Sequence, residues 1–256
     1  MADADPLIEV ESLTRRFPRC EALAGITFQI RRGEIGGVLG PNGSGKTTLL
    51  RILATELAAT SGRVRIAGFD AATHSLDVRR RIGYLPETAP LYPEMRVDEF
   101  LAFRGRIKGL RGARLAARLR DVVEQCGLGD FSRRVVGTLS RGYRQRTGLA
   151  DSLLHEPDVL LLDEPLAGLD PAQVNGVRDL LQGLGPGRCV LFSTHVLSEA
   201  EQLCHRALIL NAGLLAAADS PARLVQAGEA KDFEETFLRL TTPLPMIRNP
   251  KRRKGG

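Results

Sequence analysis

The chain has 256 residues, of which 43% are hydrophobic and 26% are charged; these proportions exclude wholesale disorder, a collagen-like fibre and a low-complexity chain. Its net charge of +6 comes mostly from residues 242–256, which hold five basic residues and no acidic one, so the rest of the chain carries about +1. No nucleic-acid partner is therefore expected for the body of the chain. The basic tail is predicted to be disordered; it could contact anionic lipid or nucleic acid, or simply aid solubility.

The length allows one large domain, or one domain with an inserted subdomain. No apolar stretch approaches the roughly 18 residues that a membrane helix needs, and the first residues lack the pattern of a signal peptide. The cysteines have neither zinc spacing nor a disulfide framework, and we interpret them as small buried side chains in a reducing compartment. We expect a chain that is neither exported nor membrane-spanning.

Short strands and helices alternate along most of the chain. Strands are predicted at 7–13, 22–30, 35–39, 63–67, 81–85, 159–162, 189–193 and 207–210. Phe17 is expected on the loop between the first two, and a helix over 47–57 follows a Gly-rich segment after the third. This alternation indicates an α/β layered fold with a mainly parallel sheet.

Between Pro86 and Glu156 the pattern changes to helix alone. Periodicity predicts helices over 97–108, 113–126 and 143–154, with no convincing strand between them. Roughly residues 88–155 are therefore expected to form an all-helical insertion in the α/β body.

A phosphate-binding loop is predicted after the third strand. The segment Gly40-Pro41-Asn42-Gly43-Ser44-Gly45-Lys46-Thr47 fits G-x-x-x-x-G-K-[ST]. Its glycines allow successive backbone N–H groups to surround phosphates, and the next helix adds its positive N-terminal end. Lys46 would bridge the β- and γ-phosphates, the Thr47 hydroxyl would ligate Mg²⁺, and Thr48 belongs to the same nucleotide-binding set. The alternative is a Gly-rich turn with a surface lysine, which the strand–loop–helix context disfavours.

The apolar run at 159–162 ends in Asp163 and Glu164. This pattern is typical of a buried central strand that delivers carboxylates to its C-terminal edge, where α/β folds bind ligands. Asp163 would hold Mg²⁺, and Glu164 would be the general base for an attacking water. A solvated acidic turn before Pro165 is the alternative, and the phosphate loop upstream makes it the weaker one.

A third segment narrows the class of nucleotide enzyme. Leu139-Ser140-Arg141-Gly142-Tyr143-Arg144-Gln145-Arg146 resembles the LSGGQ-type signature of ATP-binding cassette (ABC) ATPases. In that family the signature Ser and Gly lie at a helix N-terminus and bind the γ-phosphate held by the other subunit, a role suited to exposed N–H groups. The segment departs from consensus at Arg141 and Tyr143 but keeps Ser140 and Gly142.

Further motifs of the family follow in order. Ala167-Gly168-Leu169-Asp170 resembles the D-loop, in which Asp170 would help couple two sites across a dimer. Ser193-Thr194-His195 resembles the switch-histidine motif, in which His195 would contact the γ-phosphate and hold the attacking water. The remaining histidines, His74, His155 and His205, are interpreted as structural.

Two positions are assigned by their place in the family pattern. Phe17 stands where an aromatic stacks on adenine, with a core aromatic as the alternative. Glu87, in Tyr84-Leu85-Pro86-Glu87, occupies the Q-loop position, where most relatives have Gln. Its carboxylate could offer an oxygen to Mg²⁺ or water, and it adds a negative charge.

The resemblance covers about residues 7–241 and is closest to nucleotide-binding subunits of two-component exporters of the multidrug, lipid-polymer and gliding-motility kind. The subfamily likeness is carried by residues 90–95, 140–146, 194–201 and 234–241. It implies a P-loop NTPase fold in which an ABC ATPase core, residues 1–241, has an N-terminal antiparallel β-subdomain and a helical subdomain inserted at 88–155.

The resemblance also implies an activity. Two chains, as a homodimer or with a related cassette, would pack head to tail around two ATP with Mg²⁺. They would hydrolyse ATP at the cytoplasmic face of the cell membrane and drive a separate permease docked around Glu87 to Arg106. A non-transport ABC ATPase acting on ribosomes or DNA is the competing hypothesis, disfavoured by the single signature and the absence of a long heptad run. A non-catalytic cassette is disfavoured by the presence of Glu164 and His195.

Overall fold

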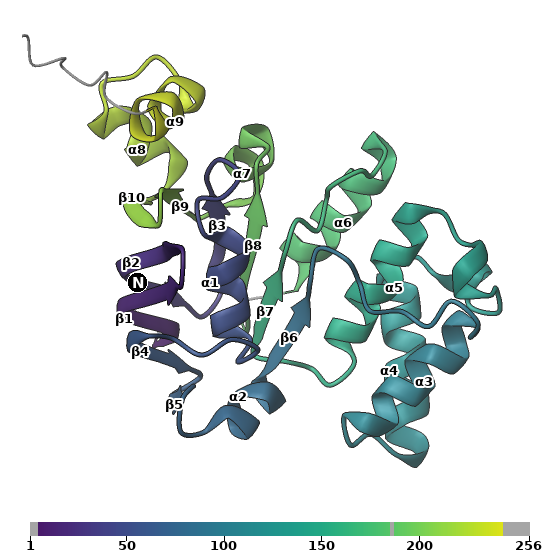
Figure 1. The fold of residues 1–256 in the computed structure, drawn as a ribbon. Coiled ribbons are helices and arrows are strands. Elements are labelled where there is room, and N and C mark those ends of the chain that lie inside the picture. The colour runs from purple at the N-terminus through teal and green to yellow at the C-terminus, as the bar shows by residue number, and fades with distance from the viewer. Residues whose placement is uncertain (1–4, 185–186, 243–256) are drawn as a thin grey trace, which may run out of the picture.

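The structure, a computed structural model, describes residues 5–184 and 187–242. The basic tail predicted over 242–256 therefore lies outside the described residues, apart from Thr242. The described chain forms two sheets and a helical lobe, which stands beside the edge strand of the larger sheet in Figure 1.

The smaller sheet is antiparallel and has the order β2-β1-β4-β5. Its strands are β1 (Pro6–Phe17), β2 (Cys20–Arg31), β4 (Ser61–Ile66) and β5 (Phe69–Asp70). The β1–β2 hairpin is longer than predicted, because its pairing continues to Phe17 opposite Cys20 and only Pro18 and Arg19 form the turn. The prediction that Phe17 lies on a loop is therefore wrong; it ends β1.

The larger sheet has the order β10-β9-β3-β8-β7-β6 and is parallel except for the edge strand β10. Its strands are β3 (Ile35–Leu39), β6 (Ile82–Leu85), β7 (Val159–Leu162), β8 (Cys189–Thr194), β9 (Arg206–Asn211) and β10 (Leu214–Asp219). Every residue of β3, β7 and β8 is buried, as expected for parallel strands covered on both faces. The predicted α/β class with a mainly parallel sheet is confirmed.

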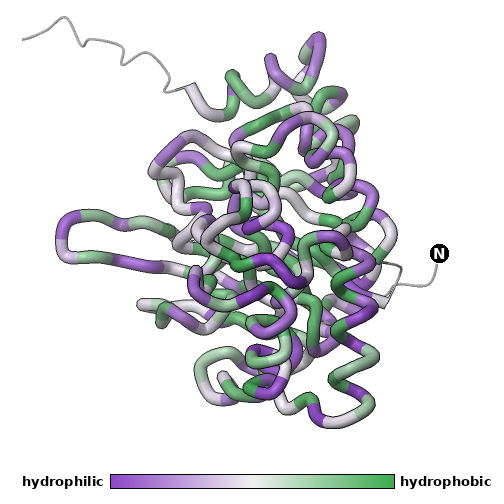
Figure 2. Tube along the Cα trace, turned by 90° about the vertical axis from the view of Figure 1, so that its right-hand side faces the viewer, coloured by the Kyte–Doolittle hydropathy of each residue, from purple (hydrophilic) through white to green (hydrophobic). Residues whose placement is uncertain are grey.

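Successive residues of the central strands face two different cores. Leu161 and Leu191 pack with α1 (Lys46–Leu53) and the antiparallel sheet, while Leu160 and Val190 pack with α6 (Pro171–Gly183) and the helical lobe. Figure 2 shows hydrophobic segments gathered inside the trace. Helix α1 ends at Leu53 rather than at 57, because the chain turns through Thr55, whose φ is 59°.

The helical lobe consists of α3 (Val97–Ile107), α4 (Gly112–Gln125) and α5 (Arg141–Leu153), with short 3₁₀ turns at Gly129–Phe131 and Val136–Thr138. Each helix lies within two residues of its predicted bounds. Four further helices flank the sheets: α2 (Ser75–Arg81), α7 (Leu197–Leu203), α8 (Pro221–Ala227) and α9 (Phe233–Thr241). The last two pack on β9 through a small third core.

Candidate functional site

A cavity of about 490 Å³ lies between the end of the β1–β2 hairpin and the carboxyl ends of the parallel strands. It brings together residues from segments far apart in the sequence. Those predicted as site residues are Phe17, Asn42, Gly43, Gly45, Lys46, Thr47, Thr48, Glu87, Glu164 and His195, and Cys20, Ala22 and Ala167 complete the lining. Most of the predicted nucleotide-contacting set therefore meets at one place.

The phosphate-binding loop joins β3 to α1 as its sequence predicts. Gly43 and Gly45 have φ of 79° and 107°, in the region that favours glycine. A Cβ at Gly45 would lie 2.5 Å from the carbonyl oxygen of Ala22, so this position also requires glycine for space. Gly45 is the N-cap of α1, which leaves the first N–H groups of that helix directed toward the loop.

Lys46 is 8% exposed and lies across the loop that precedes it. Its Nζ donates hydrogen bonds to the carbonyl oxygens of Gly40 at 2.7 Å and Pro41 at 3.3 Å. Burial lowers the pKa of Lys46, while the carboxylates of Glu164, Asp163 and Glu87 oppose that shift. Three carboxylates therefore lie near the ammonium group, but none of the described residues forms an ion pair with it.

Asp163 and Glu164 follow β7 and are held by the same side chain. Asp163 is 1% exposed, and its Oδ1 accepts a hydrogen bond from Ser193 Oγ at 2.5 Å. The backbone N–H of Glu164 donates to the same Ser193 Oγ at 2.9 Å. Asp163 Oδ2 is buried and has no hydrogen-bond partner among the described residues. The sequence analysis assigned no role to Ser193. Its position at the end of the neighbouring strand is the feature that could have indicated one.

Glu164 and His195 form the closest contact in the cavity between side chains that can take part in acid–base chemistry. Glu164 Oε2 lies 2.9 Å from His195 Nδ1; because an ionised carboxylate only accepts, Nδ1 carries the proton and donates it. The backbone of Glu164 has a φ of 49°, a conformation that costs free energy for a residue with a side chain. The side chain of Glu164 is 14% exposed and that of His195 is 59% exposed, so the pair is open to water at the histidine.

Glu87 and Phe17 stand on either side of this centre. Glu87 follows β6, is exposed, and makes no hydrogen bond or ion pair within the described residues. Phe17 is 37% exposed, so it is not a core aromatic. The Arg15 guanidinium carbon lies 4.6 Å from its ring centroid, which covers one ring face; sequence reasoning missed this contact.

The signature and D-loop residues do not line the cavity. Ser140 is the N-cap of α5, and its Oγ accepts from the Tyr143 N–H at 3.5 Å. Gly142 is buried against α6: a Cβ there would lie 2.0 Å from Gln173 Oε1. Asp170 caps α6 by accepting from the Gln173 N–H at 2.9 Å. The starts of α5 and α6 are therefore adjacent, at a place separate from the cavity.

The rest of the predicted set lies within the loop itself. Gly40, Pro41 and Ser44 do not line the cavity; Ser44 is 2% exposed, and its Oγ has no hydrogen-bond partner in the part of the chain that the structure describes. Among residues 5–184 and 187–242, no group of three or more His, Cys, Asp or Glu side chains is arranged to hold a metal ion. In the same ranges no helix is both long and apolar enough to span a bilayer.

Comparison with known proteins gives a consistent result. The sequence pattern of the family described as "ABC transporter" matches residues 23–167. The chain is 41% identical, over 82% of its length and 67% of the relative's, to daunorubicin resistance ATP-binding protein DrrA3 of Streptomyces coeruleorubidus. It is 35% identical, over 91% of its length and 73% of the relative's, to Nod factor export ATP-binding protein I of Ralstonia nicotianae.

A solved structure of the ATP-binding subunit of an ABC transporter superposes with a TM-score of 0.84 at 27% identity, covering 91% of this chain and 99% of that one. This match confirms the predicted ABC ATPase fold. The motifs, the fold and the relatives agree, and the chain belongs to the ABC transporter family as an ATP-binding subunit.

Proposed function

We propose that this chain hydrolyses ATP in a head-to-tail dimer of ATP-binding subunits and thereby drives a separate membrane permease, in the direction of export. The observation that carries the ATPase proposal is the contact between Glu164 and His195 in a cavity that also holds Lys46 and the phosphate-binding loop. In this proposal Glu164 serves as the base, His195 orients it, and Lys46 with backbone N–H donors binds the phosphates at the same site.

In this proposal Glu164 accepts a proton from the water that attacks the γ-phosphate. Its carboxylate is oriented from two sides, because Ser193 holds its backbone N–H and His195 holds Oε2. His195 Nε2 makes no hydrogen bond within the described residues, so the exposed side of the ring can face the phosphate or the water. A positioned general base contributes roughly 10²–10⁴-fold to a rate.

Lys46 is proposed to bind the β- and γ-phosphates. Its two hydrogen bonds to loop carbonyl groups keep Nζ beside the loop, at 2.7 Å and 3.3 Å, and phosphate oxygens would replace these neutral acceptors with charged ones. The N-terminal end of α1, with Asn42 to Thr48 around it, supplies backbone donors. Phe17 would stack on adenine with the ring face that Arg15 leaves open.

Mg²⁺ fits the residues present. The buried Asp163 Oδ2 has no partner in the described structure, although Asp163 does not itself line the cavity. Thr47 and Glu87 are exposed and do line it. Mg²⁺ is usually bound by one or two protein carboxylates together with substrate phosphates. A cluster of three acidic, histidine or cysteine ligands is therefore not needed. Mg²⁺ held by Asp163, Thr47 and Glu87 would neutralise charge on the phosphates during transfer.

The separation of the signature from the cavity supports the proposed dimer. Ser140, Gly142 and Asp170 lie at the starts of α5 and α6 and do not line the cavity of their own chain. Binding a γ-phosphate at Ser140 and Gly142 would then require ATP bound by a second subunit. Each of two ATP molecules would be enclosed by the loop of one chain and the signature of the other; whether the second chain is a copy or a related cassette is left open.

The permease and the export direction are supported by the relatives: one is named for resistance to daunorubicin and another for Nod factor export. We place the chain at the cytoplasmic face of the cell membrane, attached through the permease. The domain assignment behind this proposal is the ATP-binding domain 1–241 with the helical subdomain at 88–155.

The test measures steady-state ATP hydrolysis with Mg²⁺ by the purified wild-type chain and by Glu164→Gln. Size-exclusion chromatography with ATP measures the oligomeric state of both proteins. We expect turnover by the wild type, and for Glu164→Gln retained ATP binding, lost turnover and an ATP-dependent dimer. Full hydrolysis by Glu164→Gln would remove Glu164 from the role of base. A chain that binds no ATP would overturn the proposal.

A further inference from the structure

The aromatic side chain assigned to adenine is contacted by a cation that does not line the nucleotide cavity. Arg15 and Phe17 are two residues apart on β1, so their side chains lie on the same face of the strand. The guanidinium carbon of Arg15 lies over the Phe17 ring, 4.6 Å from its centroid. Phe17 lines the cavity and Arg15 does not. Arg15 therefore contacts the ring from outside the cavity lining.

A second contact fixes the guanidinium itself. Its Nη1 donates to the carbonyl oxygen of Ala58 at 3.0 Å. Ala58 belongs to the loop between α1 and β4, and this loop also pairs with β1, because the Thr60 N–H donates to the Thr14 carbonyl oxygen at 2.8 Å. The guanidinium is thus anchored to the loop that follows α1, the helix that begins at the phosphate-binding loop.

The contact with the ring is not a by-product of an ion pair. No carboxylate among the described residues pairs with Arg15. The neighbouring Arg16 differs, since its side chain lies on the other face of β1 and its Nε is 2.8 Å from Glu21 Oε1. A cation is attracted by the negative face of an aromatic ring, so Arg15 and Phe17 hold each other in place.

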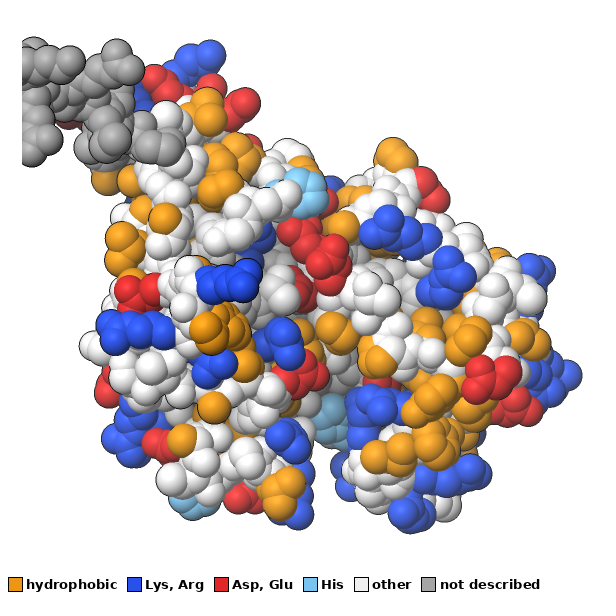
Figure 3. Space-filling model, in the orientation of Figure 1, with side chains coloured by type: hydrophobic (Ala, Val, Ile, Leu, Met, Phe, Trp, Pro, Cys, Tyr) orange, Lys and Arg blue, Asp and Glu red, His pale blue; other side chains and the backbone are white. Residues whose placement is uncertain are grey.

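Phe17 benefits from such a support because it ends a hairpin and is exposed. Its side chain is 37% exposed, and it is paired with Cys20 directly beside the turn. Figure 3 shows Lys and Arg side chains beside hydrophobic ones over the smaller sheet. An aromatic side chain that is free to rotate loses this freedom when a base stacks on it, at a cost in affinity. With Arg15 on one face, the ring is oriented before the nucleotide binds, and the opposite face stays open.

The charge of Arg15 also favours stacking on that opposite face. The faces of a phenyl ring and of adenine are both negative, so two stacked rings partly repel each other. A cation on one face draws electron density toward itself and makes the other face less negative. A phenyl ring that carries a guanidinium on one face is therefore a better partner for a base on the other.

We propose that Arg15 is a positioning residue of the nucleotide site, which holds the Phe17 ring for stacking and thereby raises the affinity for the base of ATP without contacting the nucleotide. The inference rests on the proposed function, in which Phe17 stacks on adenine, and adds the residue that orients the ring. It separates the two ends of the nucleotide: Arg15 contributes to binding of the base, and Lys46 to binding of the phosphates.

The first experiment measures equilibrium binding of ADP and of inorganic pyrophosphate, both with Mg²⁺, to the wild type, Arg15→Met and Arg16→Met. Both ligands carry two phosphates, but only ADP carries the base. We expect Arg15→Met to lower the affinity for ADP about two- to fivefold and to leave the affinity for pyrophosphate unchanged. Arg16→Met, which removes a cation from the same strand, should change neither. Equal losses for ADP and pyrophosphate with Arg15→Met would overturn the inference, because they would indicate a general effect of charge or folding.

The second experiment asks whether Arg15 acts through Phe17. Phe17→Leu should lower the affinity for ADP at least about fivefold, because base–aromatic stacking is lost. In the Phe17→Leu background, Arg15→Met should cause no further loss. An additional loss of the same size as in the wild type would overturn the inference, since Arg15 would then act without the ring.

The third experiment observes the ring itself. The chain contains no tryptophan, so Phe17→Trp introduces a single indole at the site. We expect time-resolved anisotropy of the ligand-free protein to show faster local motion of this indole when Arg15→Met is added, and quenching by ADP to require a higher ADP concentration. Unchanged local motion would overturn the inference.

Failure of the proposed function is distinguishable from failure of the inference. If the wild type binds no ADP, or if Phe17→Leu binds ADP as tightly as the wild type, adenine stacking at Phe17 is wrong. If Phe17→Leu weakens ADP binding and Arg15→Met does not, only the role of Arg15 is wrong.

Discussion

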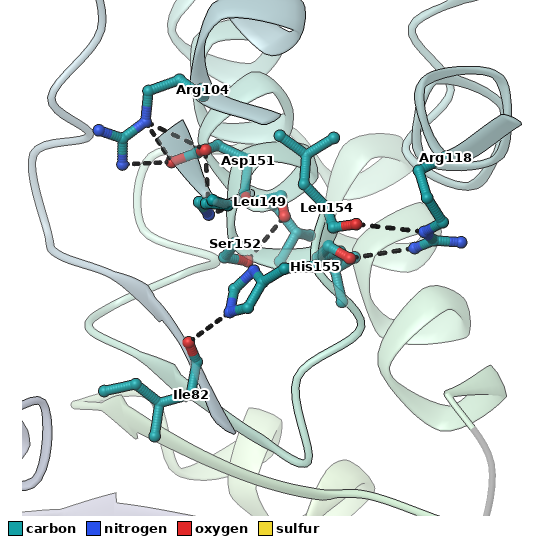
Figure 4. A network of polar contacts seen from close by, with 10 residues as sticks. Ile82, Arg104, Arg118, Leu149, Asp151, Ser152, Leu154 and His155 are labelled. Carbon is teal, nitrogen blue, oxygen red and sulfur yellow. Dashed lines mark hydrogen bonds and ion pairs between the residues drawn. The ribbon is translucent and has the colours of Figure 1, made fainter. Parts of the chain in front are cut away.

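His155 gives a prediction whose size can be worked out from the structure. Its Nε2 donates to the carbonyl oxygen of Ile82 at 2.8 Å, which joins the end of α5 to β6 (Figure 4). Its Nδ1 is buried and has no hydrogen-bond partner within the described residues. Burial and the nearby charge of Lys108 lower its pKa from 6.5 to about 4. Protonation of the His155 ring is therefore less favourable in the folded chain than in the unfolded chain.

The direction and the size of the pH effect on the unfolding free energy follow from the difference in proton binding between the folded and the unfolded chain. Between pH 6.5 and pH 4 the unfolded chain binds the proton and the folded chain does not, so acid favours unfolding. The contribution of His155 is fully present above pH 6.5 and is lost as the pH falls toward 4. Between pH 7.5 and pH 5 this loss is about 2 kcal/mol of unfolding free energy.

The assay compares the wild type with His155→Gln, whose amide can still donate to the Ile82 carbonyl group. Urea unfolding is followed by circular dichroism at pH 7.5 and pH 5, since the chain has no tryptophan. We expect the unfolding free energy of the wild type to fall by about 2 kcal/mol more than that of the variant. His74→Gln is the control for loss of an exposed imidazole. Equal losses in the wild type and His155→Gln would refute the reasoning.

Three further results are expected. Lys46→Ala should lower ATP affinity at least about tenfold in equilibrium binding, because charge-assisted hydrogen bonds to phosphate are lost; normal affinity would count against the phosphate-loop assignment. Asp151→Asn should lower the unfolding free energy by about 3 kcal/mol, since Arg104, hydrogen-bonded to the Asp151 carboxylate at 2.9–3.2 Å, and Lys108, 3.1 Å from it, lose their shared counter-charge. A loss within error in urea unfolding would show that these contacts do not stabilise the helical lobe. Cys20 is exposed and lines the nucleotide cavity, so Mg-ATP should slow its alkylation, followed by mass spectrometry, and no protection would argue against nucleotide at this hairpin.

The elements that the sequence predicted best are those whose burial leaves an uninterrupted apolar run. Strands β3 and β7 have the predicted bounds because every side chain in them is buried and their ends are marked by Gly40 and Asp163. Strand β10 and helix α8 were missed because they are short and half-exposed, and they pack at the margins of the larger core and in the small core with α9. Their stability depends on tertiary contacts that local periodicity does not contain.

The candidate site likewise has features that the sequence predicted and features that it did not. Motif spacing placed Lys46 in the loop between a strand and a helix, and Glu164 and His195 at strand ends, and the parallel sheet explains why they converge. It did not predict that His195 contacts Glu164 or that Ser193 holds both carboxylate residues, because those contacts depend on strand order and side-chain conformation. The Arg104–Asp151 pair joins residues 47 positions apart, and nothing in either local sequence marks it.

Helix α5 connects the signature to a group of charged side chains in the helical lobe. Ser140 at its start is proposed to meet ATP held by a second subunit, and Asp151, near its end, pairs with Arg104 and Lys108. The Arg118 guanidinium donates to the carbonyl oxygens of Leu153 and Leu154, so α4 also holds this end. A helix of 13 residues is about 20 Å long. Contacts from α3 and α4 therefore hold one end of the helix whose other end carries Ser140, which gives the pairing of Asp151 with Arg104 and Lys108 a role in positioning the signature.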